Sequence, residues 1–288
     1  LCDTFICGLS MKLVSIGEMT IDYYFDQRLS FVGGISLNFA VHAKRCGAEN
    51  VALVSCAGSD EAGSRIRRHL TNEGIDVSHV SGRPGKTATC DIIVNNNAER
   101  SFPEGGYRPH GLPDFKLTDR ALAFIKQHDV VVSMFDQSQP EAFFNQVSTK
   151  INFSGLRVVD FGNWNDYREG HDMILACLDK LDIIFVSGNR GTVDFLHTIS
   201  DEGTGLIVVT LGALGSIAIY QGKLWVQKAM PVARPVDSTG CGDAFQSAFT
   251  VAYLRTGNIK KALRQGAKQA ALVLQHYGAF SQTGHSNP

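Results

Sequence analysis

The sequence has no excess of charge of either sign. Its 288 residues include 27 Lys and Arg and 28 Asp and Glu, so the formal net charge is −1. Proteins that bind nucleic acid or anionic membranes usually carry a basic patch or stripe. We therefore expect neither nucleic acid nor a membrane as a partner. A small neutral or weakly charged substrate fits this balance better.

The seven cysteines form no recognisable pattern. They are scattered, they include no Cys-x-x-Cys pair, and no histidines cluster at metal-ligand spacing. An odd, scattered set indicates reduced thiols and argues against a disulfide framework or a zinc site. We therefore expect a cytoplasmic protein.

Long apolar runs are also absent. No uninterrupted run is long enough to cross a bilayer, and the first ten residues carry Asp3 without the basic region of a signal peptide. Because Met11 precedes the first convincing strand, we interpret residues 1–10 as an N-terminal extension without an assigned function.

Short apolar runs alternate with helical patterns along the chain. Helical patterns occupy Leu37–Cys46 and Gly63–Glu73, and runs of strand length occupy Lys12–Gly17, Asn50–Ala57, Val130–Phe135, Arg157–Phe161, Ile183–Ser187 and Gly205–Thr210. This alternation predicts one α/β domain over residues 11–288, with a central, mainly parallel sheet and helices on both faces. No Gly-x-Gly-x-x-Gly follows the first strand, which disfavours a dinucleotide-dependent oxidoreductase.

Two stretches interrupt the alternation. Ile21–Val32 mixes polar and aromatic residues, and Thr87–Phe102 reads as two short strands around an Asn95-Asn96-Asn97 turn. They predict a small antiparallel β lid, from about residues 20–32 and 87–106. Such a lid can cover a ligand and exclude water. A decorative extension or a dimer surface fits the same pattern, and we expect a homodimer through the lid if it exposes an apolar face. Residues 281–288 are expected to fray.

One segment combines glycines, a carboxylate and the start of a helix. Its sequence is Asp237-Ser238-Thr239-Gly240-Cys241-Gly242-Asp243-Ala244-Phe245, and apolar residues at helical spacing follow it. Backbone amides at a glycine-rich helix N-terminus make a site for phosphate. Asp243, at its edge, can accept the proton of an attacking hydroxyl. Alternatively, Asp243 only caps the helix and the glycines only turn the chain.

This segment resembles the C-terminal signature of the ribokinase-like, or PfkB, carbohydrate kinases, usually written D-T-x-G-A-G-D-x-F. The resemblance implies a ribokinase-like fold and transfer of the ATP γ-phosphoryl group to a hydroxyl. It implies Asp243 as catalytic base, with the amides of Gly240, Cys241 and Gly242 as anion hole. The chain departs from the signature at Ser238 and Cys241. Cys241 keeps a small residue there, although its thiol also suggests sensitivity to oxidation.

Other pieces of the family pattern occur in order from Met11 to about Phe280. Gly33-Gly34-Ile35-Ser36-Leu37-Asn38 is similar to the N-terminal G-G-x-x-x-N signature, and Asp22 follows the first strand where the family has a substrate-binding Asp. The resemblance therefore implies that Asp22, Gly33, Gly34 and Asn38 hold the acceptor. Paired glycines allow close approach of a polyol, and Asn38 offers a donor and an acceptor. In the lid, Arg100 and Tyr24 are candidate substrate contacts.

A second group of residues resembles the family's nucleotide site. Thr210-Leu211-Gly212-Ala213-Leu214-Gly215 is similar to its T-L-G-x-x-G stretch, and the helical pattern Gly266–Gly278 corresponds to the region beside the adenine. The resemblance implies ATP contacts from Thr210, Gly212, Gly215, Asp237, Thr239, Gly240 and Gly242.

The family's N-x-x-E motif is incomplete. Ser187-Gly188-Asn189-Arg190 has no carboxylate in register. Mg²⁺ is still expected, because the charge on the transferred phosphoryl group must be neutralised. The protein ligands of the metal stay open, and Asn189 or Arg190 are candidates for direct phosphate contact.

The acceptor is the least determined feature. The segments Asp160–Asp166 and Leu274–Ala279 look closest to the fructoselysine 6-kinase branch, which implies phosphorylation of a primary hydroxyl on a fructose-like sugar. Ribose, fructose and 2-keto-3-deoxygluconate stay open. A nucleoside kinase of the same family is the alternative, favoured if Tyr23, Tyr24 and Phe25 line a large aromatic pocket. The missing Glu also leaves open a non-catalytic binding protein on this fold.

Overall fold

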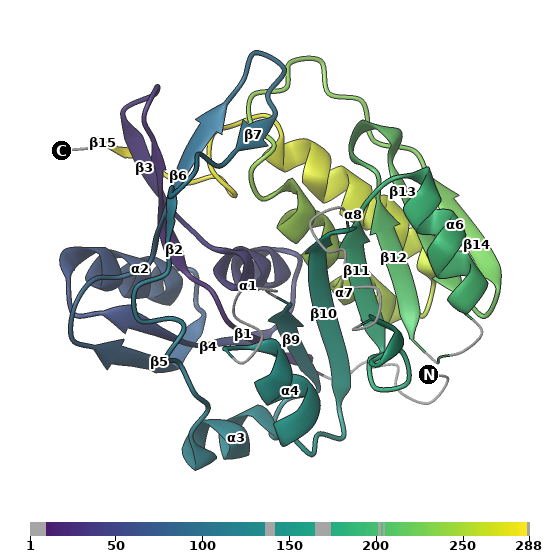
Figure 1. The fold of residues 1–288 in the computed structure, drawn as a ribbon, viewed down its shortest axis with the longest axis horizontal. Coiled ribbons are helices and arrows are strands. Elements are labelled where there is room, and N and C mark those ends of the chain that lie inside the picture. Colours follow the sequence, from purple (N-terminus) through teal and green to yellow (C-terminus); the bar gives the residue numbers. More distant parts are fainter. Residues whose placement is uncertain (1–9, 136–141, 165–173, 201–202, 204, 287–288) are drawn as a thin grey trace.

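The apolar runs form one nine-stranded sheet in the computed structural model, which describes residues 10–135, 142–164, 174–200, 203 and 205–286 (Figure 1). Neighbouring strands pair in parallel except around β13, which is antiparallel to both of its neighbours. The spatial order is β14 (Lys223–Gln227), β13 (Ser216–Tyr220), β12 (Leu206–Thr210), β11 (Ile183–Ser187), β10 (Leu156–Asn163), β9 (Val130–Met134), β1 (Lys12–Ile16), β4 (Asn50–Gly58) and β5 (Asp76–Arg83).

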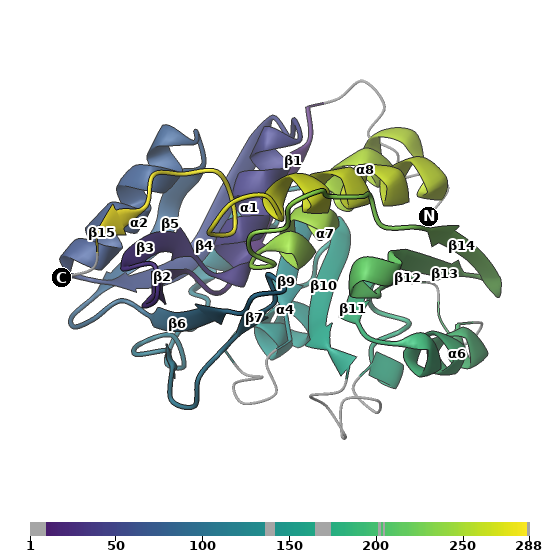
Figure 2. The same cartoon turned by 90° about the horizontal axis from the view of Figure 1, so that it is seen from above.

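Helices cover both faces of this sheet (Figure 2). One face carries α1 (Ile35–Arg45), α2 (Glu61–Asn72), α7 (Cys241–Thr256) and α8 (Ile259–Val273), and the other carries α3 (Asp119–Ile125), α4 (Phe144–Lys150) and α6 (Arg190–Ile199). Successive residues of β1 enter different cores: Leu13 packs beneath the first set of helices and Val14 beneath the second. The predicted α/β sandwich is confirmed.

The lid is a second, smaller sheet that stands beside the carboxyl ends of the main strands (Figure 1). It contains β2 (Thr20–Tyr24), β3 (Leu29–Gly33), β6 (Thr89–Val94), β7 (Arg100–Ser101), β8 (Tyr107–Arg108) and β15 (His285–Ser286). The expectation of an antiparallel lid holds for the pairs β2–β3, β3–β15, β6–β7 and β6–β8, but β2 and β6 pair in parallel. Each follows a strand of the parallel sheet, β1 and β5, so both leave the body in the same direction.

The expectation that residues 281–288 fray is wrong for the residues that the structure describes. The Gln282 side chain accepts from Val32 N at 3.0 Å and donates to Val32 O at 2.8 Å. β15 then pairs with β3. Further back, Ala279 is fully buried and its carbonyl contacts His42 Nε2 at 2.8 Å. We call residues 277–286 the strap, because they tie the lid to the helical layer.

Within the described ranges, none of the helices combines the length and the apolar composition that crossing a bilayer requires.

Candidate active site

The predicted anion loop, residues 237–242, leads directly into α7. Gly240 precedes the helix with φ = 75°, and a Cβ atom there would lie 2.4 Å from Ala279 Cβ. A Cβ on Gly242 would meet open space. The amides of Gly242 and Asp243 have no hydrogen-bond partner in the described part of the chain. Two free donors at the positive end of a 16-residue helix therefore face open space, as a phosphate site requires.

The amide of Cys241 is not available in the same way. It donates to Ser238 O at 3.2 Å, so the anion hole predicted from Gly240, Cys241 and Gly242 loses one of its three amides, and Asp243 N offers a further one. The Cys241 thiol points toward α8, where Sγ contacts Ala270 O at 3.6 Å. Burial raises the pKa of this thiol to about 12. A neutral, turned-away thiol supports the interpretation of Cys241 as a small residue rather than a redox-sensitive group.

Asp243 is a buried carboxylate held by a neighbouring helix. It is 9% exposed, and Asn38 Nδ2 on α1 donates to its Oδ2 at 2.7 Å. Because α7 has no side-chain cap, Asp243 is not merely a helix cap. Burial, with the charge of Asp160, raises the pKa of Asp243 to about 7, although Asn38 and Arg100 oppose the shift. A base with this pKa can exchange a proton near neutral pH.

Asn38 has one polar atom left over. Its Oδ1 is buried and has no hydrogen-bond partner among the described residues. A buried carbonyl oxygen without a donor is costly, so this atom is ready to accept from a ligand hydroxyl.

Asp22 lies near Asp243. It is 4% exposed, and Thr20 Oγ1 donates to its Oδ1 at 2.6 Å. Burial raises its pKa to about 7, and the charges of Glu18 and Asp243 add to the shift. The negative charge of Asp243 therefore disfavours ionisation of Asp22, which places both carboxylates in one polar site.

The paired glycines, Gly33 and Gly34, make room for neighbouring atoms of the protein itself. A Cβ on Gly33 would lie 1.9 Å from Asp22 Oδ2, so the absence of a side chain makes room for that carboxylate. Gly34 has φ = 101°, and its Cβ would lie 2.6 Å from Met19 Cα. Gly33 thus lets Asp22 approach the start of α1, and Gly34 lets the backbone at Met19 do so, while the predicted contact of both glycines with a polyol stays a prediction.

Asp237 and Thr239 do not face a nucleotide. Asp237 is fully buried, and its oxygens accept from Thr239 N, Thr239 Oγ1, Tyr24 Oη and Gly278 N, at 2.7–3.0 Å. The direct ATP contacts predicted for these two residues are therefore not supported by the geometry. With every lone pair directed at the protein, Asp237 shapes the anion loop instead.

The predicted nucleotide side of the site, residues 210–215, is an exposed turn at the end of β12. Thr210 ends β12, and its hydroxyl lies 2.8 Å from Ser187 Oγ. Gly212 has φ = 57°, a Cβ atom on it would meet nothing within 4 Å, and Leu214 is 79% exposed. At Gly215 the turn itself demands glycine, because φ is 105° and a Cβ would lie 2.1 Å from Gln227 O. Gly212 is thus the accessible glycine of the pair.

The helix predicted at Gly266–Gly278 has different limits. α8 runs from Ile259 to Val273, with Asn258 as its N-cap, and Gly278 lies beyond it in the strap. Val236 N donates to Leu274 O at 2.7 Å, which ties the chain before the anion loop to the end of α8.

Arg100 reaches the anion loop from the lid. Its backbone amide donates to Ser238 Oγ at 3.0 Å, and Nη1 donates to Ser238 O at 3.3 Å. The guanidinium also lowers the pKa of Asp243, which shows that its charge acts on this site. Arg100 therefore lies on the phosphate side, whereas the sequence predicted a sugar contact.

The aromatic triplet of β2 does not line one pocket. Tyr24 is fully buried, and its hydroxyl is committed to Asp237. Tyr23 points to the opposite face of the strand, and Phe25 is 57% exposed. The specific argument for a nucleoside pocket at these residues is thereby removed.

Asp160 is a site residue whose role sequence reasoning missed. It lies near the carboxyl end of β10 and is 8% exposed. Its Oδ1 accepts from Gly162 N at 2.8 Å. Burial raises the pKa of this carboxyl, and Asp160 in turn raises that of Asp243. A carboxylate directly after an apolar strand was the available signal; Asn165 and Asp166, quoted with it, lie outside the described residues.

The residues present fit a magnesium–nucleotide complex better than a protein metal cage. No cluster of three or more His, Cys, Asp or Glu side chains suited to a metal occurs in the described ranges. Asn189 is committed to capping α6 through Thr192, and Arg190 is exposed. Because Mg²⁺ keeps several waters and needs only one or two carboxylates, Asp160 would suffice as a protein ligand, which leaves Asp243 free to act as a base.

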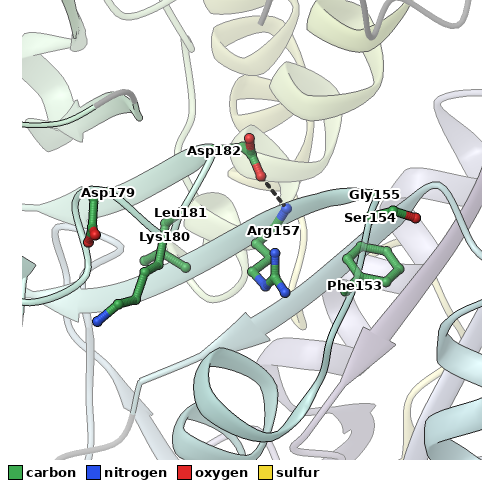
Figure 3. A pocket seen from close by; sticks show the side chains of 8 residues that line it. All are labelled: Phe153, Ser154, Gly155, Arg157, Asp179, Lys180, Leu181 and Asp182. Carbon is green, nitrogen blue, oxygen red and sulfur yellow. Dashed lines mark hydrogen bonds between the residues drawn. The ribbon is translucent and has the colours of Figure 1, made fainter.

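A separate cavity lies at the other end of the sheet (Figure 3). It has a volume of ≈ 350 Å³ and includes Arg157, Lys180, Asp179 and Asp182. Arg157 N donates to Asp182 Oδ2 at 2.8 Å, and both residues lie where β10 and β11 begin. Asp243 and Asp160 lie at the carboxyl ends of the strands, where parallel α/β sheets bind ligands, so this cavity is not part of the site.

Residues 10–283 match the pfkB family of carbohydrate kinases. Fructoselysine 6-kinase of Escherichia coli (strain K12) is 28% identical over 273 residues, covering 93% of this chain and 99% of that protein. Fructosamine kinase FrlD of Bacillus subtilis (strain 168) is 27% identical over 281 residues, covering 94% and 93%. The fold matches Arabidopsis thaliana ribokinase complexed with ribose and ATP, with a TM-score of 0.74 and 21% identity over 94% and 95% of the chains. The chain belongs to the pfkB family of carbohydrate kinases and is an ATP-dependent sugar kinase.

Proposed function

We propose that this kinase transfers the γ-phosphoryl group of ATP to a primary hydroxyl of a fructose-like acceptor, with a fructosamine such as fructoselysine as the best candidate. The observation that carries the proposal is the Asn38–Asp243 pair beside two free amides of α7. A base and an anion site in the first turn of α7 then meet a hydrogen-bonding acceptor on α1.

The acceptor binds between Asp22 and Asn38. Asp22 accepts from one sugar hydroxyl, and the unpartnered Asn38 Oδ1 accepts from another. The reacting hydroxyl then lies against Asp243. As its oxygen attacks the γ-phosphorus, Asp243 takes the proton, and the bond between the γ-phosphorus and the leaving oxygen of ADP breaks.

The anion loop and Arg100 stabilise the charge that develops on the transferred group. Gly242 N and Asp243 N donate to it along the axis of α7, and the Arg100 guanidinium approaches from the lid. Mg²⁺, when bound with ATP, would neutralise phosphate charge, and Asp160 would hold it. The lid excludes water that would otherwise compete for the phosphoryl group.

The two curated relatives named above support the fructosamine class. Both carry that substrate class in their names, and both align over more than nine-tenths of this chain. Asp22, Cys90 and Tyr107 share one face of the lid in register, so this face presents polar and aromatic groups to an acceptor.

We also propose a cytoplasmic homodimer that pairs through the lid. Phe25, Ile93 and Phe102 of the lid are 57%, 40% and 55% exposed, and a second lid would cover them. Light scattering after size exclusion should give the mass of a dimer, and a monomer at working concentration would contradict the proposed dimer.

The proposed cytoplasmic location is supported by the free thiols in the described residues, which suit a reducing compartment.

The test of function measures ATP consumption with Mg²⁺ against fructosamines, hexoses, pentoses, keto-acids and nucleosides. Asp243→Asn keeps the shape of the side chain and removes the base, so we expect kcat to fall by about 10²-fold or more with little change in nucleotide affinity. Asp119→Asn, an exposed change on α3, is the matched control.

Each outcome separates the alternatives. A fructosamine hit that is lost in Asp243→Asn supports the proposal, and a hit confined to nucleosides selects the nucleoside kinase. Binding of ATP or sugar without turnover by the wild type would favour a non-catalytic protein. Near-normal turnover in Asp243→Asn would remove Asp243 as the base.

A further inference from the structure

The lid and the anion loop are joined by hydrogen bonds at two points. Tyr24 Oη on β2 donates to Asp237 Oδ2 at 2.7 Å. At the tip of the β6–β7 hairpin, Ser238 N donates to Ala98 O at 2.8 Å, and Arg100 contacts Ser238. Elements that are far apart in the sequence are therefore coupled directly at the site.

The Tyr24 contact differs from the hairpin contact because β2 also carries Asp22. Alternate residues of a strand share a face, so the Asp22 carboxylate and the Tyr24 hydroxyl project from the same side of β2. Tyr24 is fully buried, and its ring packs edge-on against Phe31 at 5.2 Å and Tyr277 at 5.9 Å between ring centroids. A shift of β2 must therefore move both groups together.

Asp237 connects Tyr24 to the anion loop and to the strap through hydrogen bonds. Its Oδ1 holds the backbone and hydroxyl of Thr239, and its Oδ2 holds Gly278 of the strap. The next strap residue, Ala279, packs against Gly240 at the start of α7. Burial and the Asp237 charge raise the pKa of the Tyr24 hydroxyl, so it stays protonated and donates.

Asp22 receives few hydrogen bonds from the protein itself. Thr20 Oγ1 is the one side-chain donor to this buried carboxylate among the described residues, and Glu18 and Asp243 add negative charge. A sugar hydroxyl that donates to Asp22 relieves the shortage. Acceptor binding therefore favours the position of β2 in which Tyr24 reaches Asp237.

We propose that Tyr24 is a positioning residue that couples occupancy of the acceptor site to the geometry of the anion loop. The sugar and the magnesium–nucleotide complex then raise each other's affinity by the same factor, because coupling between two sites is reciprocal. The inference rests on the proposed function, since it needs an acceptor at Asp22.

The test measures the dissociation constant of Mg²⁺ and AMP-PNP by calorimetry, with and without saturating fructoselysine or the acceptor that the panel identifies. In the wild type the acceptor should tighten nucleotide binding by roughly 5-fold or more, the usual scale of such coupling. In Tyr24→Phe, which removes one oxygen and keeps the ring, this ratio should fall toward one, and kcat should fall with it.

Tyr23→Phe is the matched control. It makes the same change on the opposite face of the same strand, where the hydroxyl has no hydrogen bond in the described part of the chain, and it should keep the wild-type ratio. Asp237→Asn disturbs the same bond from the other side and should repeat the effect of Tyr24→Phe. A merely structural role would lower the unfolding midpoint and leave the ratio unchanged.

Two results would overturn the inference: a wild-type ratio of one, or an unchanged ratio in a folded Tyr24→Phe. Either result leaves the proposed function standing, because turnover by the wild type is measured separately. A wild type that phosphorylates nothing in the panel would instead remove the proposed function.

Discussion

The acceptor side and the nucleotide side of the site are built on opposite principles. On the acceptor side, Asp22 and Asp243 are buried carboxylates whose pKa values are raised to about 7, beside an amide oxygen without a donor. On the nucleotide side, Gly212 and Leu214 offer exposed backbone and apolar surface. The groups proposed to bind and deprotonate the acceptor are therefore buried and polar, whereas the surface offered to the nucleotide is exposed.

Backbone changes at two glycines, Gly240 in the buried anion loop and Gly212 on the exposed nucleotide side, should give the largest contrast in activity. Gly240→Ala adds a Cβ 2.4 Å from Ala279 Cβ, whereas Gly212→Ala adds one in open space, and both residues have positive φ. Gly240→Ala should lower kcat/KM by roughly 10²-fold through displacement of the anion loop. Gly212→Ala should raise the KM for ATP only a few-fold. Steady-state kinetics check both, and equal effects would erase the contrast.

The pH profile should follow the acceptor side. If ionised Asp243 is the base, kcat/KM should level off above pH 7 and fall about tenfold per unit below it. Nucleotide affinity should change much less over the same range, because the backbone amides and glycines proposed to bind the nucleotide do not titrate. Assays between pH 5 and 8.5 check this, and a midpoint near 4 would show that burial does not control Asp243.

The effect of Asp243 on stability should be the smallest of the three. Stability should fall as pH rises, whereas activity should increase. The folded pKa of Asp243 is about 7 against an ordinary 3.8, so the folded protein binds more protons than the unfolded chain between these values. Stability therefore falls as pH rises through this window. Asp243→Asn removes the buried charge and should raise Tm at pH 8, by about 2–4 °C for each kcal/mol in chains of roughly this size. The gain should vanish near pH 4, and a gain that persists there would point to packing instead.

Much of the site could be predicted because its residues are neighbours in the sequence. The glycines, Asp243 and the start of α7 are neighbours in the chain, so their arrangement follows from helix geometry alone. The Val- and Ile-rich runs likewise predicted the buried strands, with limits within about two residues of those observed.

Contacts between residues that are far apart in the chain could not be predicted from the sequence. The bonds Tyr24–Asp237 and Val32–Gln282 join residues 213 and 250 positions apart, and no local preference indicates either of them. For this reason Tyr24 was interpreted as a substrate contact, Asp237 as a nucleotide contact and residues 281–288 as frayed. The parallel pairing of β2 with β6 was missed for the same reason.

The strap also has a consequence for how the protein is made. Synthesis runs from the N-terminal to the C-terminal side, so the hairpin that carries Asp22, the other lid strands except β15, and the anion loop all leave the ribosome before residues 277–286. Until the strap arrives, Asp237 lacks the amide of Gly278, and Val32 lacks both bonds from Gln282. A growing chain can thus complete most of its fold while its phosphate site is still unfinished, and that site is completed only after residues 277–286 have been made.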